Sequence, residues 1–183
     1  MDKAAYKPLT IYPHTSIVVY MEKNDSIFAF IDSQNLNLGV KSQGWTLDFA
    51  RFRILLREKY CVEQAYIFIG LIAEYQSIYT HLQKSGFILV FKPILEYKKN
   101  KKTIIKGNVD AELVLHTMIE YPNYEKAVIV SGDGDFHCLI EYLFKKRKLA
   151  KVIVPNLHYS SLLKKFSEYI VNINFFKEKV RMR

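Results

Sequence analysis

Four aspartates occupy positions from which they could share a metal ion. Asp32 ends one apolar run, Asp133 and Asp135 follow another, and Asp110 begins a stretch with helical periodicity. Gathered carboxylates repel each other by roughly 3 kcal/mol per pair at about 5 Å and an effective dielectric of about 20, so they need cations or protons nearby. Mg²⁺ and Mn²⁺ prefer carboxylate and water oxygens, and no Cys/His cluster in the sequence favours zinc. The predicted chemistry is hydrolysis assisted by Mg²⁺ or Mn²⁺.

Each of these aspartates also has a simpler interpretation. Asp32 could cap a turn, Asp133 could cap the start of a helix, and Asp110 could be a first-turn acid favoured by the helix dipole. Taken singly, such roles are commoner than metal binding. Their joint placement beside the ends of apolar runs favours a shared site.

From residue 26 onward, apolar runs of strand length alternate with stretches of helical periodicity, and these elements must position the acids. Strands are expected at 27–31, 65–69, 87–91, 127–130, 152–154 and 169–171, and helices at 47–59, 75–84, 109–119, 136–146 and 162–166. This alternation predicts a three-layer α/β/α fold with a central, mostly parallel sheet. Ligands of such sheets bind beyond the carboxyl ends of the strands, where the chain order reverses. Asp32 and Asp133 are expected at that edge.

The 183 residues, half of them hydrophobic, suit one domain with small additions. We expect an N-terminal extension at 1–25, the main α/β domain at 26–176, and a frayed basic tail at 177–183. No apolar run reaches the roughly 18 residues of a membrane span. Cys61 and Cys138 are far apart and are expected in the core of a cytoplasmic protein. A membrane partner is not expected, and the sequence leaves a homo-oligomer open.

The charge balance favours a polyanionic partner. The chain has 27 Lys and Arg against 18 Asp and Glu, a formal charge of +9, and nucleic acid is the first candidate for such a surplus. A group of lysines lies just before Asp110, next to Tyr97; it comprises Lys98, Lys99, Lys101, Lys102 and Lys106. Lysines beside an aromatic ring suit a phosphate backbone with a stacked base. A solvated loop is the alternative, and we expect RNA contact.

Three blocks of the sequence resemble the signatures of the NYN domain, a family of PIN-like nucleases that includes the LabA-like proteins. The blocks are FIDSQNL at 30–36, KGNVDAEL at 106–113 and VIVSGDGDF at 128–136. Their order and separation also match, and the resemblance covers residues 26–172. Two departures occur: Ser33-Gln34 replaces the common glycine after the first aspartate, and one extra residue precedes Asp110.

The resemblance implies a PIN-like fold with Rossmann-like topology and a metal-dependent ribonuclease activity. It implies that the catalytic, metal-binding acids are Asp32, Asp110, Asp133 and Asp135, with Asn35 and Ser131 as supporting polar groups. The expected function is therefore hydrolysis of RNA phosphodiester bonds. The alternative is a catalytically weak RNA-binding or regulatory module of the same fold. A phosphatase of the haloacid dehalogenase type also carries an Asp-x-Asp pair, but after its first strand, whereas here the pair follows the fourth.

Overall fold

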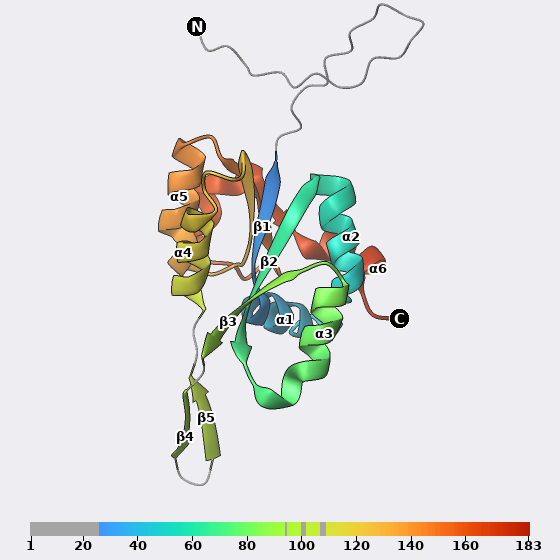
Figure 1. Cartoon of the computed structure of the whole chain (residues 1–183). Helices are drawn as coiled ribbons and strands as arrows, with labels where there is room; N and C mark the ends of the chain where they lie inside the picture. The colour runs from blue at the N-terminus through green and yellow to red at the C-terminus, as the bar shows by residue number, and fades with distance from the viewer. Residues whose placement is uncertain (1–25, 94, 100–101, 107–108) are drawn as a thin grey trace, which may run out of the picture.

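The computed structural model describes residues 26–93, 95–99, 102–106 and 109–183. Its centre is a six-stranded sheet in the order β3-β2-β1-β6-β7-β8, and all neighbouring strands in it run parallel. Helices cover both faces (Figure 1). The predicted three-layer α/β/α fold with a parallel sheet is confirmed. The extension expected at 1–25 lies outside the described residues.

The elements follow the expected order. The sheet consists of β1 (Ile27–Asp32), β2 (Val62–Leu71), β3 (Ile88–Pro93), β6 (Lys126–Val130), β7 (Leu149–Val154) and β8 (Ile170–Asn172). The helices are α1 (Ser33–Lys41), α2 (Phe49–Tyr60), α3 (Gln76–Lys84), α4 (Asp110–Ile119), α5 (His137–Lys145) and α6 (Lys177–Val180). Short 3₁₀ segments are η1 (Ala73–Tyr75), η2 (Gly134–Phe136), η3 (Ser161–Tyr169) and η4 (Ile173–Phe176). A separate antiparallel pair is formed by β4 (Leu95–Lys99) and β5 (Lys102–Lys106).

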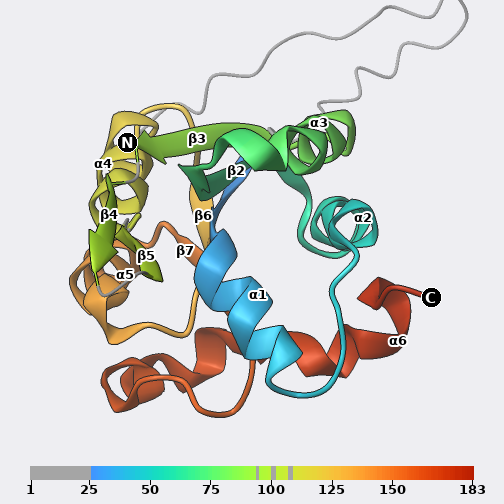
Figure 2. The same cartoon turned by 90° about the horizontal axis from the view of Figure 1, so that it is seen from below.

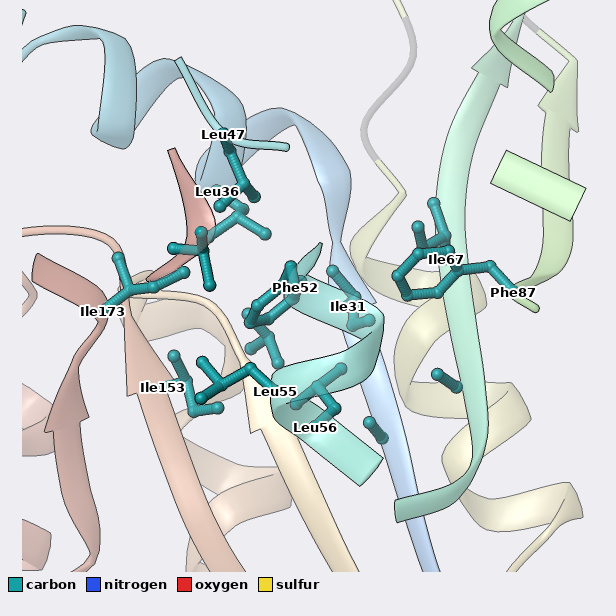
Figure 3. Packing of buried hydrophobic residues seen from close by; sticks show 14 of the residues in the cluster. Ile31, Leu36, Leu47, Phe52, Leu55, Leu56, Ile67, Phe87, Ile153 and Ile173 are labelled. Carbon is teal, nitrogen blue, oxygen red and sulfur yellow. The ribbon is translucent and has the colours of Figure 1, made fainter. Parts of the chain in front are cut away.

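The central strands are apolar throughout because both faces of the sheet are buried. In β1, Ala29 and Ile31 face the core under α1 and α2, whereas Phe28 and Phe30 face the core under α4 and α5. Figure 3 shows the first core, in which Phe52 of α2 packs near Ile31. Burial on both sides removes the polar alternation of a half-exposed strand. It also holds β1 rigidly beneath the edge where the acids lie.

The chain order reverses between β1 and β6. From β1 the chain proceeds outward through β2 to β3, and from β6 it proceeds in the other direction through β7 to β8. The two central strands pair in register, with Ile31 opposite Val130. The residues that follow, Asp32 and Ser131, therefore leave the sheet side by side at its switch point.

Helix α1 was not expected from the sequence. Its segment contains Asn35, Asn37 and Gly39, which are poor helix formers. Packing outweighs that propensity, because Leu36 and Val40, four residues apart on one face, are both fully buried.

The lysine-rich segment before Asp110, for which a solvated loop was the alternative to RNA contact, contains two strands. The backbone forms the β4–β5 hairpin, in which Leu95 pairs with Lys106 and Lys99 pairs with Lys102. The hairpin projects from the end of the molecule at which β1 ends and α1 begins (Figure 1). Alternation of Leu95 and Tyr97 with charged residues, followed by the β-branched Thr103, is the sequence pattern of such a pair of strands.

The frayed tail expected at 177–183 is also wrong. Val180 is fully buried in the core. Val180 and Met182 form backbone hydrogen bonds with the segment that precedes α2. The Asp48 amide donates to the Val180 carbonyl at 2.8 Å, and the Met182 amide donates to the Thr46 carbonyl at 2.9 Å.

Both cysteines were expected in the core, and both are exposed. Cys61 caps the C-terminal end of α2 in the left-handed conformation, with φ 54°, so its side chain leaves the helix face that the preceding residues bury. None of the described helices combines the length and apolar character that a membrane crossing requires.

Gly39 allows α1 to approach the loop after β7. A Cβ at this position would lie 2.6 Å from Cβ and Cγ of Pro155, atoms of a rigid ring that cannot rotate away. We expect Gly39→Ala to destabilise the protein by about 1–3 kcal/mol, the usual cost of overpacking. Chemical denaturation measures this, with Lys41→Ala at an exposed site of the same helix as the control. A Gly39→Ala protein as stable as the control would contradict the close packing.

Candidate metal centre

Three carboxylates meet at the carboxyl edge of the sheet. Asp110, Asp133 and Asp135 each offer one oxygen, and these oxygens lie within 4.8 Å of one another. Asp110 is the first residue of α4, and the other two flank Gly134 directly after β6. Asp110 and Asp133 are half-buried, whereas Asp135 is exposed. The described residues hold no second group of this kind among Asp, Glu, His and Cys side chains.

The turn after β6 is fixed by its own hydrogen bonds. The Asp135 amide donates to Asp133 Oδ1 at 3.1 Å, so Asp133 caps η2. Gly134 leaves no room for a side chain, because a Cβ there would collide with Ser160 Oγ. The glycine between the two aspartates therefore lets η3 approach and hold both acids in place.

Asp32 lies at the end of β1 with its side chain almost fully buried, at 5% exposure. Its Oδ1 accepts a hydrogen bond from the Asn35 amide at 3.0 Å, which caps α1. Its Oδ2 accepts a longer hydrogen bond from Ser131 Oγ at 3.4 Å. Asp32 therefore both caps α1 and belongs to the acidic site.

Asn35 and Ser131 connect the two central strands. The Gly132 amide donates to Asn35 Oδ1 at 2.9 Å, and the Asp133 amide donates to Ser131 Oγ at 3.1 Å. Since Asn35 and Ser131 also contact Asp32, the end of β1 and the turn after β6 form one hydrogen-bonded unit. The structure brings both residues to the acids, as the sequence indicated.

The electrostatics of the centre are most evident at Asp32. Burial raises the pKa of Asp32 to about 6, and the charges of Asp110 and Asp133 act in the same direction. The Asn35 amide and the Ser131 hydroxyl oppose the increase in this pKa by donating to the carboxylate. Burial and the neighbouring charges have the larger effect, so the ionised Asp32 carboxylate is not fully compensated by the protein alone.

Comparisons with known proteins identify the family of this chain. The family model for the NYN domain matches residues 26–174. The chain belongs to the NYN domain family. The matched residues include all four aspartates, and the fold is nuclease-like.

Two relatives of this NYN protein bear on its fold. It is 24% identical over 152 residues to the low amplitude and bright protein LabA of Synechococcus elongatus, covering 79% of this chain and 82% of that protein. The crystal structure of a protein of unknown function from Vibrio parahaemolyticus superimposes with a TM-score of 0.69 at 22% identity. That comparison covers 88% of this chain and all of the other, and it shows a shared fold.

Asp32, Asp110 and Asp133 of the NYN domain border a cleft of about 1100 Å³. Sequence reasoning missed Lys92, which lines this cleft and pairs with Glu112 at 2.9 Å. It stands next to the end of β3, so a search for polar residues at strand ends would have found it. Three exposed side chains of apolar or aromatic character, Leu38, Ile78 and Tyr75, also line the cleft. The lining of the cleft therefore combines carboxylates with exposed apolar side chains.

The donor set fits a hard divalent cation. Carboxylate oxygens and open space for water are what Mg²⁺ and Mn²⁺ require, since both retain part of their hydration shell. Asp110, Asp133 and Asp135 meet this requirement directly through their clustered oxygens. Asp32 lies outside that trio and acts on Asp110 and Asp133 through its charge.

The lysines expected to contact RNA lie on the β4–β5 hairpin. Lys98 and Lys99 belong to β4, and Lys102 and Lys106 belong to β5; Lys101 lies outside the described residues. Seen from the carboxyl edge of the sheet, the hairpin lies next to α4, the helix that follows it in the chain (Figure 2).

The buried Asp32 carboxyl predicts a specific dependence of stability on pH. Because its folded-state pKa of about 6 exceeds the ordinary aspartate value of 3.8, the native state binds more protons than the unfolded state between those values. The metal-free protein should therefore lose up to about 3 kcal/mol of unfolding free energy through this group as pH rises from 4 to 7. In EDTA, Asp32→Asn should remove this loss and be more stable than wild type at pH 7. Parallel pH profiles for wild type and variant would refute the raised pKa.

Proposed function

We propose that this NYN domain is a metal-dependent ribonuclease that hydrolyses RNA phosphodiester bonds with Mg²⁺ or Mn²⁺. The observation that supports it most strongly is the meeting of Asp110, Asp133 and Asp135 oxygens within 4.8 Å at the switch point of a parallel sheet. Such a cluster in an open cleft is suited to a phosphate substrate, whose oxygens can share the cation.

The residues take distinct roles in this proposal. Asp110, Asp133 and Asp135 would hold the metal, and Asp32, expected as a fourth ligand, would add its negative charge to the site. A bound Mg²⁺ or Mn²⁺ would neutralise the phosphate and lower the pKa of a water molecule. Asp135, the exposed member of the trio, or Asp32 would orient a water molecule for in-line attack on the phosphate. Asn35 and Ser131 keep the two strand ends aligned through their hydrogen bonds to Asp32 and to the turn after β6.

RNA is the proposed partner on the grounds of charge. The chain carries a formal charge of +9, although its cleft has an acidic floor. The segment before Asp110 offers Lys98, Lys99, Lys101, Lys102 and Lys106 as the proposed phosphate contacts. A cytoplasmic location and self-association stay predictions.

The second candidate function is an RNA-binding or regulatory module without substantial catalysis. It is favoured by the concentration of lysines on a hairpin outside the acidic cluster, since that surface could bind RNA whether or not the acids act. Cleavage and binding must therefore be measured separately.

Asp133→Asn tests the catalytic role. Removing a charged ligand should lower Mn²⁺-dependent cleavage of a labelled single-stranded RNA by at least about a hundredfold, since even partners of metal ligands contribute 10- to 100-fold. RNA binding should persist, because the lysines remain. Glu58→Gln removes an exposed acid from α2 and serves as the control. Metal-dependent cleavage that survives in Asp133→Asn would contradict the assignment, and wild-type binding without cleavage would favour the second candidate.

A second experiment tests the hairpin. Replacing Lys98, Lys99, Lys101 and Lys102 by Ala should weaken RNA binding at low salt and flatten its salt dependence. Each phosphate contact contributes a slope of about −0.7 for single strands. The matched control replaces four exposed lysines elsewhere, Lys41, Lys84, Lys164 and Lys179. Equal salt slopes for the two quadruple variants would mean that the hairpin has no special role and that the overall charge alone attracts RNA.

A further inference from the structure

A second cavity lies at the opposite edge of the sheet from the acids. Its volume is about 780 Å³, within the range of pockets that hold small molecules. It is lined by Ile27, Tyr60, Lys126, Phe144, Lys145, Arg147, Leu149, Ala150, Lys151 and Tyr169. Ile27, Lys126 and Leu149 are the first residues of β1, β6 and β7. The cavity is therefore at the amino edge, a full strand length from the metal centre.

The charge of this cavity has one sign. Four cationic side chains line it, and none of the described residues in its lining is acidic. Lys145 shares its charge with Glu141, at 3.6 Å. Lys151 donates to the Glu168 carbonyl at 3.2 Å, a neutral acceptor that leaves the ammonium charge uncompensated. A concentration of like charge around a concave surface attracts an anion.

Arg147 is the cation best suited to a phosphate. It follows the end of α5 in the left-handed conformation, with φ 59°, and its guanidinium can donate two parallel hydrogen bonds to phosphate oxygens. The side chain is exposed at the cavity rather than packed into the core.

The cavity also has an aromatic wall. The rings of Phe144 and Tyr169 lie 5.5 Å apart at 86°, and the Lys151 ammonium stands 5.8 Å from the Tyr169 ring centre. Tyr60 closes the other side, and its hydroxyl is buried without a hydrogen-bond partner among the described residues. Buried polar groups in proteins are normally paired, so this hydroxyl points to a missing polar partner.

We propose that this cavity binds a nucleoside phosphate, with its phosphate against Arg147 and Lys151 and its base against the ring of Phe144 or Tyr169. A simple anion would use the charge and leave the aromatic wall without a role. An apolar ligand would leave the cations unsatisfied. Only a ligand that combines an anionic group with a flat ring uses both features. The ligand can be a free nucleotide or the phosphorylated end of a nucleic acid.

The site is independent of the proposed ribonuclease activity, because its residues lie at the other edge of the sheet and its occupancy needs no metal. Binding is measured by isothermal titration calorimetry of the full chain in EDTA. The probes are AMP, adenosine, inorganic phosphate, and a ten-residue oligoadenylate with or without a 5′-phosphate.

The decisive variant is Arg147→Gln/Lys151→Gln. Gln and Arg are equally strained in the left-handed conformation, so the fold should be retained, and circular dichroism checks this. The control Lys84→Gln/Arg183→Gln removes one lysine and one arginine from exposed positions elsewhere. A further control, Asp133→Asn/Asp135→Asn, alters the metal centre alone.

AMP should bind more tightly than adenosine or inorganic phosphate, and the cavity variant should weaken AMP binding at least tenfold. Both control variants should bind AMP like wild type. If only the 5′-phosphorylated oligonucleotide binds, and the cavity variant weakens it, the ligand is a nucleic-acid end. The proposal is overturned if no probe binds, if the cavity variant binds like the matched control, or if Asp133→Asn/Asp135→Asn removes the binding.

Discussion

Repulsion among carboxylates at one edge of the sheet is the constraint on which the rest of this structure depends. Burial, with the neighbouring charges of Asp110 and Asp133 acting in the same direction, raises the pKa of Asp32 to about 6. Such a cluster does not stabilise a fold by itself, and here the neighbouring strand ends and hydrogen bonds hold the acids together. The paired ends of β1 and β6 bring Asp32 beside Ser131, and the hydrogen bonds of Asn35 and Ser131 hold the acidic turn against that strand end. Two buried hydrophobic cores, one on each face of the sheet, hold these strands in position by close packing.

The parallel sheet and the site could be predicted because both depend on strong local signals. Runs such as 27–31 and 127–130 are apolar without interruption, which requires burial on both faces. The topology then places the residues after these runs at one edge, so Asp32 and Asp133 were expected together before any coordinates. Asp110 was harder to place, since it begins a helix and does not follow a strand. The structure nonetheless brings its carboxylate to Asp133 and Asp135.

The features that sequence reasoning missed depend on long-range packing. Helix α1 forms from a segment rich in Asn and Gly because Leu36 and Val40 reach the core. The C-terminal residues are ordered because Val180 fills a space beside α2, which no pattern within residues 177–183 reveals. Cys61 and Cys138 border apolar runs yet face solvent, because membership of an apolar neighbourhood does not determine which face of an element a side chain occupies. Lys92 was missed because a single lysine after an apolar run does not differ in sequence from an ordinary solvated lysine; its contact with Glu112 brings together residues far apart in the chain.

The acidic cluster and the second cavity lie at opposite edges of the sheet and carry charges of opposite sign. Aspartates gather at the carboxyl edge, and lysines with Arg147 line the cavity at the amino edge. The account rests above all on the carboxyl edge holding a divalent cation. The most direct measurement is anomalous diffraction from a crystal of the protein soaked in Mn²⁺. The account predicts a manganese peak within coordination distance of carboxylate oxygens from Asp110, Asp133 and Asp135. No peak among these residues at saturating Mn²⁺, or a peak bound only elsewhere, would contradict it.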